Sequence, residues 1–272
     1  MATASNLLPA GPGVPVGVLL RAWRQRRRRS QLDLALDAEL SQRHLSFVEN
    51  GRASPSREMV LRLAEHLEVP LHERNGLLIA AGYAPLYAER PLHDPAMRAA
   101  REAVELILRA HAPHPALAMD RRWNLLAANA TVAPLLAGVD AALLAPPVNV
   151  MRLALHPRGL APRVANYPEW RAHLLERLRR QVEGSADPVL ATLSAELAAL
   201  PVPPSAGRPA RGTPGDIAVP LELETAQGRL SLISTTTVFG TPAEITLSEL
   251  AIEAFYPADA ATAERLKRLQ DG

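Results

Sequence analysis

Residues 30–56 read SQLDLALDAELSQRHLSFVENGRASPS, and this stretch decides how the first third of the chain folds. Ser30 and Ser41 each precede a run with helical apolar spacing, where a hydroxyl group can cap the free N–H groups of a helix. The Asn-Gly pair ends the second run, because glycine adopts the positive φ that many helix ends require. The stretch therefore predicts two short helices, 31–38 and 42–49, joined by a tight turn.

The segments on either side of this stretch extend the helical pattern. Apolar residues recur at helical spacing once before it and twice after it, and Pro70 separates the last two runs. The beginning of the chain is rich in Pro and Gly, and we expect a disordered tail over residues 1–15. The sequence thus predicts an all-α domain of five helices over residues 16–90. The three further helices are expected at 16–28, 54–68 and 71–81.

Positive charge is concentrated in the same part of the chain. The first 56 residues hold eight Arg against four acidic residues, whereas residues 91–272 hold eighteen basic groups against nineteen acidic ones. A helix that rests on a preceding helix and presents a polar, basic face can enter the major groove of DNA, where nearby Arg residues add salt-dependent affinity. The helical pair is therefore interpreted as a DNA-binding motif, with an ordinary helical hairpin as the alternative.

The residues expected to contact DNA lie near the starts of the two helices and beside them. Gln42 and Arg43 follow the second cap, and their side chains can pair with adenine and guanine, respectively. Ser46 and Phe47 lie one turn further on, and Phe47 either contacts a thymine methyl group or packs on its own domain. Gln31 is expected to reach a phosphate, helped by the dipole of its helix. Two flanking residues, Arg28 and Arg52, complete the candidate set.

The motif in this stretch can be written Ser30-Gln-x-x-Leu34-Ala35 … Leu40-Ser41-x-x-x-Leu45-Ser46-x-Val48-Glu49-Asn50-Gly51-Arg52-x-x-Pro55-Ser56. It resembles the helix-turn-helix of the Xre or lambda-repressor-like family, over about residues 16–82. The resemblance implies that Arg24, in the first helix, pairs with Glu49 inside the domain. Such a pair would stabilise the fold, because removal of one partner leaves a buried charge. Glu39 departs from the family, which usually has glycine at this turn, and a side chain at positive φ costs about 1 kcal/mol.

Beyond residue 90 the pattern changes to a mixture of helices and strands. Residues 116–119 and 123–127 flank a polar turn and predict a hairpin. Three strand-like runs follow a Pro/Gly-rich loop at 201–215, and Pro220 within the first run indicates an edge strand or a bulge. Residues 91–272 are therefore expected to form an α+β domain with a roughly five-stranded antiparallel sheet. The later runs are 217–223, 229–239 and 245–256, and helices are expected at 94–111, 129–136 (capped by Asn129), 170–182, 187–200 and 259–270.

A second set of looser motifs occurs in order along the chain. They are Gly82-Tyr83-Ala84-Pro85, His114-Pro115-Ala116, Asp120-x-x-Trp123-Asn124-x-x-x-x-Asn129 and Asn149-x-x-Arg152-Leu153-x-x-His156-Pro157. Together with the preceding helical domain, these motifs make the chain similar to MmyB-like transcription regulators. The resemblance implies an Xre-type DNA-binding domain followed by a PAS-like ligand-binding domain that senses a small molecule.

A PAS-like domain often encloses a cavity between its sheet and its helices. Aromatic residues make up only 4% of the chain, so an aliphatic cavity would suit a fatty-acid-like ligand better than a flat haem or flavin. Arg152, Arg163 or His156 could hold a carboxylate at the mouth of the cavity. The alternative is a solid core, with Arg152 as a structural cap. The apolar residues expected to line the cavity are Trp123, Leu125, Met151, Leu153, Trp170, Leu174, Leu232 and Phe239.

Several classes of protein and site lack support in the sequence. The absence of Cys excludes disulfides, Cys-based zinc sites and thiol nucleophiles. The chain also lacks GxSxG, P-loop and GxGxxG motifs, so we predict no enzyme, no metal site and no cofactor. Its apolar runs are too short to span a bilayer, and the acidic amphipathic run after Arg26–Arg29 argues against an export signal. A cytoplasmic location is expected.

These features together predict a sequence-specific transcription regulator that binds double-stranded DNA. One recognition helix reads only a few base pairs, so we expect a homodimer on two half-sites. The second domain, or the helix at 259–270, is expected to supply the dimer contact. One alternative is a second domain that only dimerises or binds a protein partner. The other is an enzyme with a DNA-targeting domain.

Overall fold

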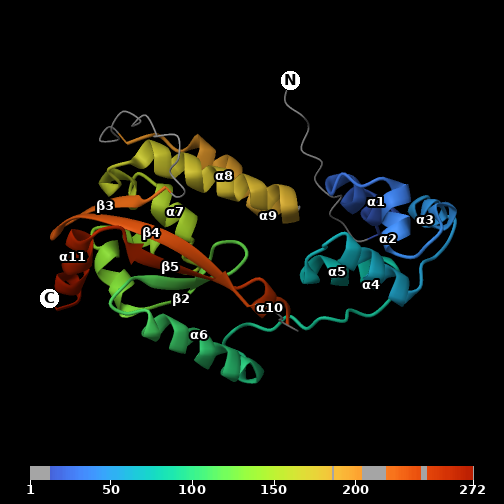
Figure 1. The fold of residues 1–272 in the computed structure, drawn as a ribbon, viewed down its shortest axis with the longest axis horizontal. Helices are drawn as coiled ribbons and strands as arrows, with labels where there is room; N and C mark the ends of the chain where they lie inside the picture. Colours follow the sequence, from blue (N-terminus) through green and yellow to red (C-terminus); the bar gives the residue numbers. More distant parts are fainter. Residues whose placement is uncertain (1–12, 186, 204–218, 240–243, 272) are drawn as a thin grey trace. The chain divides into compact units, whose positions relative to one another are not determined.

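The computed structural model of this chain describes residues 13–185, 187–203, 219–239 and 244–271. These residues divide into two compact units, of which the first contains the chain up to Glu89 and the second contains most of the chain from Arg90 onward (Figure 1). Most of the expected tail at 1–15 and of the expected loop at 201–215 lies outside the described residues. Within the described residues, no helix has the length and apolar character needed to cross a membrane.

The described part of the first unit is an array of short helices, which confirms the predicted all-α domain. Ser30 and Ser41 cap the second and third helices as expected, because their Oγ atoms accept hydrogen bonds from the N–H groups of Asp33 and His44. The fourth helix starts later than predicted, since Ser56 rather than Ser54 caps it. The helices are α1 (Val16–Arg26), α2 (Gln31–Asp37), α3 (Gln42–Glu49), α4 (Arg57–His66) and α5 (Leu71–Ala80).

Each of these helices is followed closely by a residue with positive φ. At the turn between α2 and α3, Glu39 has a φ of 53°, and the Leu40 N–H donates to the Ala35 carbonyl at 2.8 Å. This is the reversed geometry that glycine usually supplies at a helix end, so Glu39 adopts the turn despite its side chain. The residues in this position after α1 to α5 are Arg28, Glu39, Gly51, Glu68 and Gly82.

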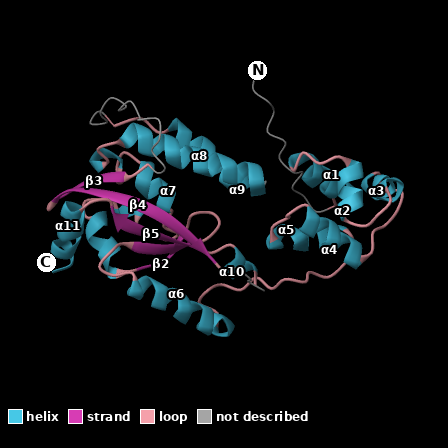
Figure 2. Ribbon diagram, in the orientation of Figure 1, coloured by secondary structure: helices cyan, strands magenta, loops and turns pink. Residues whose placement is uncertain are grey.

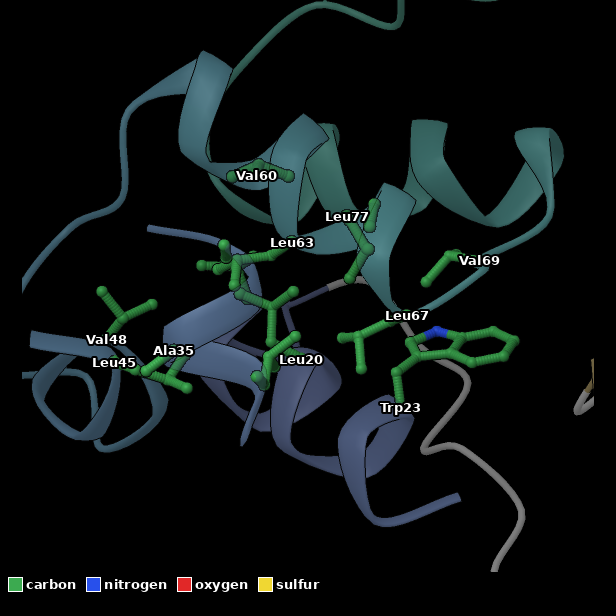
Figure 3. Packing of buried hydrophobic residues seen from close by; sticks show 14 of the residues in the cluster. Leu20, Trp23, Ala35, Leu45, Val48, Val60, Leu63, Leu67, Val69 and Leu77 are labelled. Atoms are coloured by element: carbon green, nitrogen blue, oxygen red, sulfur yellow. The ribbon is translucent and has the colours of Figure 1, made fainter. Parts of the chain in front are cut away.

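The core of the first unit lies where the helices meet (Figure 3). Leu20 and Trp23 of α1 are buried together with Leu63 of α4 and Leu77 of α5. Helix α1 also approaches α3 closely, because a Cβ atom added at Gly17 would lie 2.2 Å from the Val48 carbonyl oxygen. The core thus fixes α3 by one face and leaves its other face toward solvent.

The described residues of the second unit form a five-stranded antiparallel sheet, as predicted (Figure 2). The strand order is β2-β1-β5-β4-β3, so the hairpin β1–β2 and the hairpin β3–β4 flank the last strand, β5. Strand β3 lies at an edge, and Pro220 directly precedes it, in agreement with the weak hydrogen-bonding capacity of proline. The strands are β1 (Ala116–Met119), β2 (Leu125–Ala128), β3 (Leu221–Thr225), β4 (Gly228–Val238) and β5 (Ala251–Pro257).

Helices cover both faces of this sheet. Val104 and Leu108 of α6 pack on one face against Ala116, Ala118 and Ile252. Helices α7 and α8 lie on the other side (Figure 1). The helical segments are η1 (Pro95–Met97), α6 (Arg98–Ala110), η2 (Ala130–Leu136), η3 (Ala141–Leu143), α7 (Val150–Leu155), η4 (Ala161–Arg163), α8 (Tyr167–Ser185), α9 (Pro188–Ala199), α10 (Ile245–Ser248) and α11 (Ala260–Asp271).

Three details of the second unit differ from the prediction. The expected strand at 245–256 is divided into the one-turn helix α10 and strand β5, because both segments are apolar and one-turn helices carry no clear period. Helix α7 was missed for the same reason, since it has only six residues. Asn129 does not cap η2; its side chain accepts from the Ala116 N–H and donates to the carbonyls of Leu108 and His114.

Candidate functional sites

A buried ion pair joins the helices of the first unit. The Glu49 side chain has an exposed fraction of 0%, and it accepts hydrogen bonds from Arg24 Nε at 2.6 Å and Arg24 Nη2 at 2.8 Å. The hydrogen bond with Glu49 raises the pKa of Arg24, although burial opposes this effect. This is the ion pair that the Xre resemblance implies, and it connects α1 with α3.

Gln31 takes part in the same cluster. Its Nε2 atom donates to Glu49 Oε2 at 2.8 Å, so the side-chain amide is directed at the ion pair. From the sequence, a phosphate contact was predicted for this side chain. The structure places it inside the helical interface instead, because the buried carboxylate needs a third donor and α2 begins directly beside it. A phosphate contact at this point would rely on the N-terminus of α2 or on the second amide proton.

The outer face of α3 presents the residues expected to read bases. Gln42 and Arg43 are exposed, and Ser46 and Phe47 are half-buried. The Arg43 guanidinium carbon lies 5.3 Å from the centre of the Phe47 ring, a cation–π contact that restricts the long Arg side chain. Phe47 is absent from the core cluster of this unit, so its ring supports Arg43 on the outer face.

The basic residues after α1 have different environments. Arg27 donates to the carbonyls of Leu67 and Glu68 at 2.9 Å each and thereby caps the end of α4, while Arg29 pairs with Asp37. Arg28 and Arg52, by contrast, are exposed. Of the expected phosphate contacts, these two side chains are the ones that the fold leaves at the surface.

An apolar cavity of about 90 Å³ lies inside the second unit. It is bounded by the sheet on one side and by η2, α7 and α8 on the other, and its wall includes Val132, Leu135, Leu221, Leu223 and Phe255. Nine residues were predicted from the sequence to form such a cavity, eight apolar ones and Arg152. The structure brings seven of them together there, namely Trp123, Leu125, Met151, Leu153, Trp170, Leu174 and Leu232.

The other two named residues lie elsewhere. Phe239 packs against the apolar cluster beneath α6, on the opposite face of the sheet, because β4 ends at Val238 beyond the cavity. Arg152 points away from the cavity to α9, where its Nε and Nη2 atoms each donate to Glu196 at 2.7 Å. The short helix α7 causes this, since Met151 and Leu153 turn inward and leave Arg152 on the outer side.

The alternative carboxylate anchors named from the sequence are also engaged outside the cavity wall. Arg163 donates to the carbonyls of Leu135 and Ala137 and so ties η4 to the end of η2. His156 accepts a hydrogen bond at Nδ1 from the Arg158 N–H at 3.0 Å. Both groups stabilise loop conformations, and neither belongs to the cavity lining.

A charged pair at the cavity was missed by the sequence analysis. Glu253 of β5 is 3% exposed and lines the cavity, and its Oε1 atom accepts from Arg177 Nη1 at 3.0 Å. Arg177 also donates to Thr236 Oγ1 at 2.8 Å, and its guanidinium carbon lies 4.5 Å from the Trp123 ring centre. The available signal was a single acidic residue within the apolar run AIEAFY at 251–256.

Two further side chains of α8, Trp170 and His173, form an aromatic pair. Trp170 lines the cavity and stacks on His173, with the ring centres 5.5 Å apart. Burial lowers the pKa of His173, and neighbouring Arg177 lowers it further, whereas Glu253 acts in the opposite direction. The lowered pKa favours the neutral form of the His173 ring, and the charges at this point are those of the Glu253–Arg177 pair.

The position of Trp123 depends on the hairpin turn before it. Asp120 Oδ1 accepts from the N–H groups of Arg122 at 2.7 Å and Asn124 at 2.9 Å, and this turn holds Trp123 at a φ of 66°. A bulky residue in the left-handed region is uncommon and needs support from its surroundings. Asn149 adds that support by donating to the Arg122 carbonyl at 2.9 Å. These contacts explain the Asp-x-x-Trp-Asn motif.

Comparison with known proteins assigns both units. A helix-turn-helix domain model matches residues 15–77, which include α1 to α4 and most of α5. The model of the MmyB-like transcription regulator ligand binding domain matches residues 100–269, more than half of the chain. A search of curated proteins finds no significant match. These matches agree with three features of the structure: the order of the two domains, the exposed face of α3 and the apolar cavity. The chain therefore belongs to the MmyB-like transcription regulators, which are DNA-binding proteins.

Proposed function

We propose that this regulator reads its operator through α3 and adjusts this activity to a small apolar ligand held in the cavity of the second unit. The observation that carries the proposal is the cavity itself, whose wall is almost entirely aliphatic and aromatic. Such a wall favours an apolar molecule, because burial of apolar surface stabilises by roughly 25 cal/mol per Å². A cytoplasmic location and the absence of catalysis are parts of the same proposal.

The DNA-reading role of α3 rests on the division of its two faces. Leu45 and Val48 are buried, whereas Gln42 and Arg43 at the N-terminal end are exposed. The first turn of a recognition helix is the part that approaches base edges in the major groove. Arg28 and Arg52 are suited to phosphate contacts beside it.

The ligand is proposed to carry an acyl-like apolar chain. A flat cofactor has little support, because the wall consists mainly of flexible aliphatic side chains. The volume of about 90 Å³ is smaller than the engineered cavity of roughly 150 Å³ that takes up benzene, so a short chain is favoured over a long one. A longer chain would require the wall to widen.

Homodimerisation is proposed on geometric grounds. A single α3 would contact only a few base pairs, and two copies on half-sites about 34–36 Å apart would supply the missing specificity. The second unit, including α11, is the proposed source of the contact. Light scattering of the full chain with and without operator DNA tests this, and a monomer under both conditions would contradict it.

The principal alternative is a second unit that only dimerises or binds a protein. A fully packed core would favour this alternative, and the cavity is an observation against it.

The enzyme alternative requires an acid, a base and a nucleophile close together. Within the described residues that line the cavity, the charged group is the buried Glu253 carboxylate, and the half-buried Arg177 neutralises it.

The test of the proposed function combines both units of the intact chain. Binding sites are first selected from random duplex DNA, and affinity for the best site is then measured while short apolar molecules are added. We expect one preferred sequence and a change in affinity with at least one ligand. Equal binding to all sequences would contradict the DNA-reading role, and indifference to every apolar compound would contradict the sensing role.

A further inference from the structure

Among the residues of the apolar cavity wall, Glu253 of β5 and Trp170 of α8 carry a polar group. One is the Glu253 carboxylate, of which only Oε1 receives a hydrogen bond from the described residues. The other is the indole N–H of Trp170, which is buried and has no hydrogen-bond acceptor within the described chain. Trp170 itself is 3% exposed. A buried donor without an acceptor is unfavourable, so an acceptor supplied by a ligand would stabilise the complex.

The charge of Glu253 is already balanced. Arg177 contacts Glu253, Thr236 and the face of Trp123, and its positive charge is neutralised by the Glu253 carboxylate. A second carboxylate brought into the cavity would face Glu253, and the described residues that line the cavity include no Lys or Arg. Two like charges in a low-dielectric site disfavour each other strongly, and the remaining wall is apolar. The cavity therefore disfavours a ligand with an ionised head group.

Building on the ligand-sensing role proposed above, we propose that the cavity selects an uncharged acyl derivative, such as a primary amide or an alcohol, rather than a free fatty acid. Its polar head accepts a hydrogen bond from Trp170 Nε1 and donates one to Glu253, while its chain lies along the aliphatic wall. A primary amide and an alcohol each offer both a donor and an acceptor, whereas an ionised acid offers only acceptors.

Calorimetric titration of the full chain at pH 7.5 tests this with three six-carbon probes: hexanamide, 1-hexanol and hexanoate. We expect the amide and the alcohol to bind at least about tenfold more tightly than the anion. Binding of the anion is weakened because its charge loses water and finds no partner in the cavity. Hexanoate binding as tightly as hexanamide would overturn the proposal and leave the sensing role intact. Failure of all three probes to bind would overturn the sensing role and this inference with it.

Two variants test the assigned groups. Glu253→Gln removes the repelling charge and frees Arg177, so we expect hexanoate to become the preferred probe. Trp170→Phe keeps the ring but removes the N–H, and hexanamide should bind about three- to tenfold more weakly. Glu176→Gln is the matched control, because Glu176 pairs with Arg179 and Arg180 on the exposed side of α8 and should leave all three affinities unchanged.

The variants remain informative if one of them is unstable. Circular dichroism and thermal melting without probe establish whether each variant is folded. If Glu253→Gln is not folded, two measurements still test the proposal. They are the relative affinities of the three probes for the unchanged chain and the effect of Trp170→Phe on hexanamide affinity. An unchanged ratio of hexanamide to hexanoate affinity in a folded Glu253→Gln variant contradicts the proposed role of Glu253.

Discussion

Arg43 and Arg28 are both exposed in the first unit, yet their surroundings assign them different tasks. Arg43 lies at the start of α3 and is steadied by the Phe47 ring, so its guanidinium group can meet a guanine in a fixed geometry. Arg28 follows α1 and has no such support from α3. The first is suited to sequence recognition and the second to general attraction for phosphates.

Substitution of these two residues separates the tasks. We expect Arg43→Ala to cost about 1–3 kcal/mol at the preferred site and to relax the preference at one base position. Arg28→Ala should weaken binding to all sequences alike and reduce the slope of log affinity against log salt by about 1. Fluorescence anisotropy with matched and mismatched duplexes over a range of salt measures both effects. Undiminished binding of Arg43→Ala to the preferred site would show that the base contacts lie elsewhere on α3.

The buried carboxylate of Glu49 links three helices of the first unit. It receives three hydrogen bonds, from Arg24 and Gln31, and thereby joins α1, α2 and α3. We expect Glu49→Gln to lower the free energy of unfolding of the first unit by about 3–5 kcal/mol, because Arg24 is left as an unpaired charge. Urea denaturation followed by circular dichroism measures this. Asp37→Asn, which breaks the exposed pair with Arg29, is the control and should cost less than about 1 kcal/mol.

At the scale of elements, the position of α3 depends on how closely α1 can approach it. Gly17 allows this approach, since any Cβ atom there would meet the backbone carbonyl of Val48. The backbone of α3 cannot move without disturbing Leu45 and Val48 in the core. If α3 reads DNA as proposed, Gly17 contributes indirectly, because it allows the close approach of α1 that fixes the position of α3.

A pair of glycine substitutions tests this packing. Gly17→Ala should destabilise the chain by about 1–3 kcal/mol through overpacking. Gly76→Ala, in α5, should stabilise it by roughly 0.5–1 kcal/mol, because nothing lies within 4 Å of the added Cβ and alanine favours a helix. Thermal unfolding of both variants measures whether each substitution lowers or raises the melting temperature. Equal effects from the two substitutions would mean that the α1–α3 contact is not tight in solution.

At the scale of the whole molecule, the two units have separate cores. Among the residues that the structure describes, the buried members of the core cluster of the first unit end at Leu78, and the second unit has its own sheet and apolar cluster. Such separation predicts that the first unit folds alone. It also agrees with the proposal that dimerisation and sensing belong to the remainder of the chain.

A fragment ending at Glu89 tests this division. We expect it to unfold cooperatively and to keep the base preferences of one half-site, while its affinity for a two-site operator falls because the proposed dimer contact is lost. Calorimetry and anisotropy on the fragment and the full chain provide the comparison. A fragment with no cooperative transition would show that the first unit depends on the second.

The sequence by itself determined the elements that depend on local physics. Serine caps, the Asn-Gly stop and apolar spacing are interactions within a few residues, so the helices of the first unit and the hairpin at β1–β2 could be predicted closely. The cavity itself was expected from the family resemblance, and the structure places seven of the nine named residues in its wall. The ion pair of Arg24 and Glu49 came from the family resemblance rather than from any local rule.

Only the tertiary structure decided which polar groups meet. Glu253 joins Arg177 across a separation of 76 residues, and Arg152 turns to Glu196 instead of the cavity. These choices depend on the register of β5 and on the direction of the short helix α7, which no local pattern encodes. Long-range packing sets such pairs, because a buried charge must find its partner wherever the fold brings one within reach.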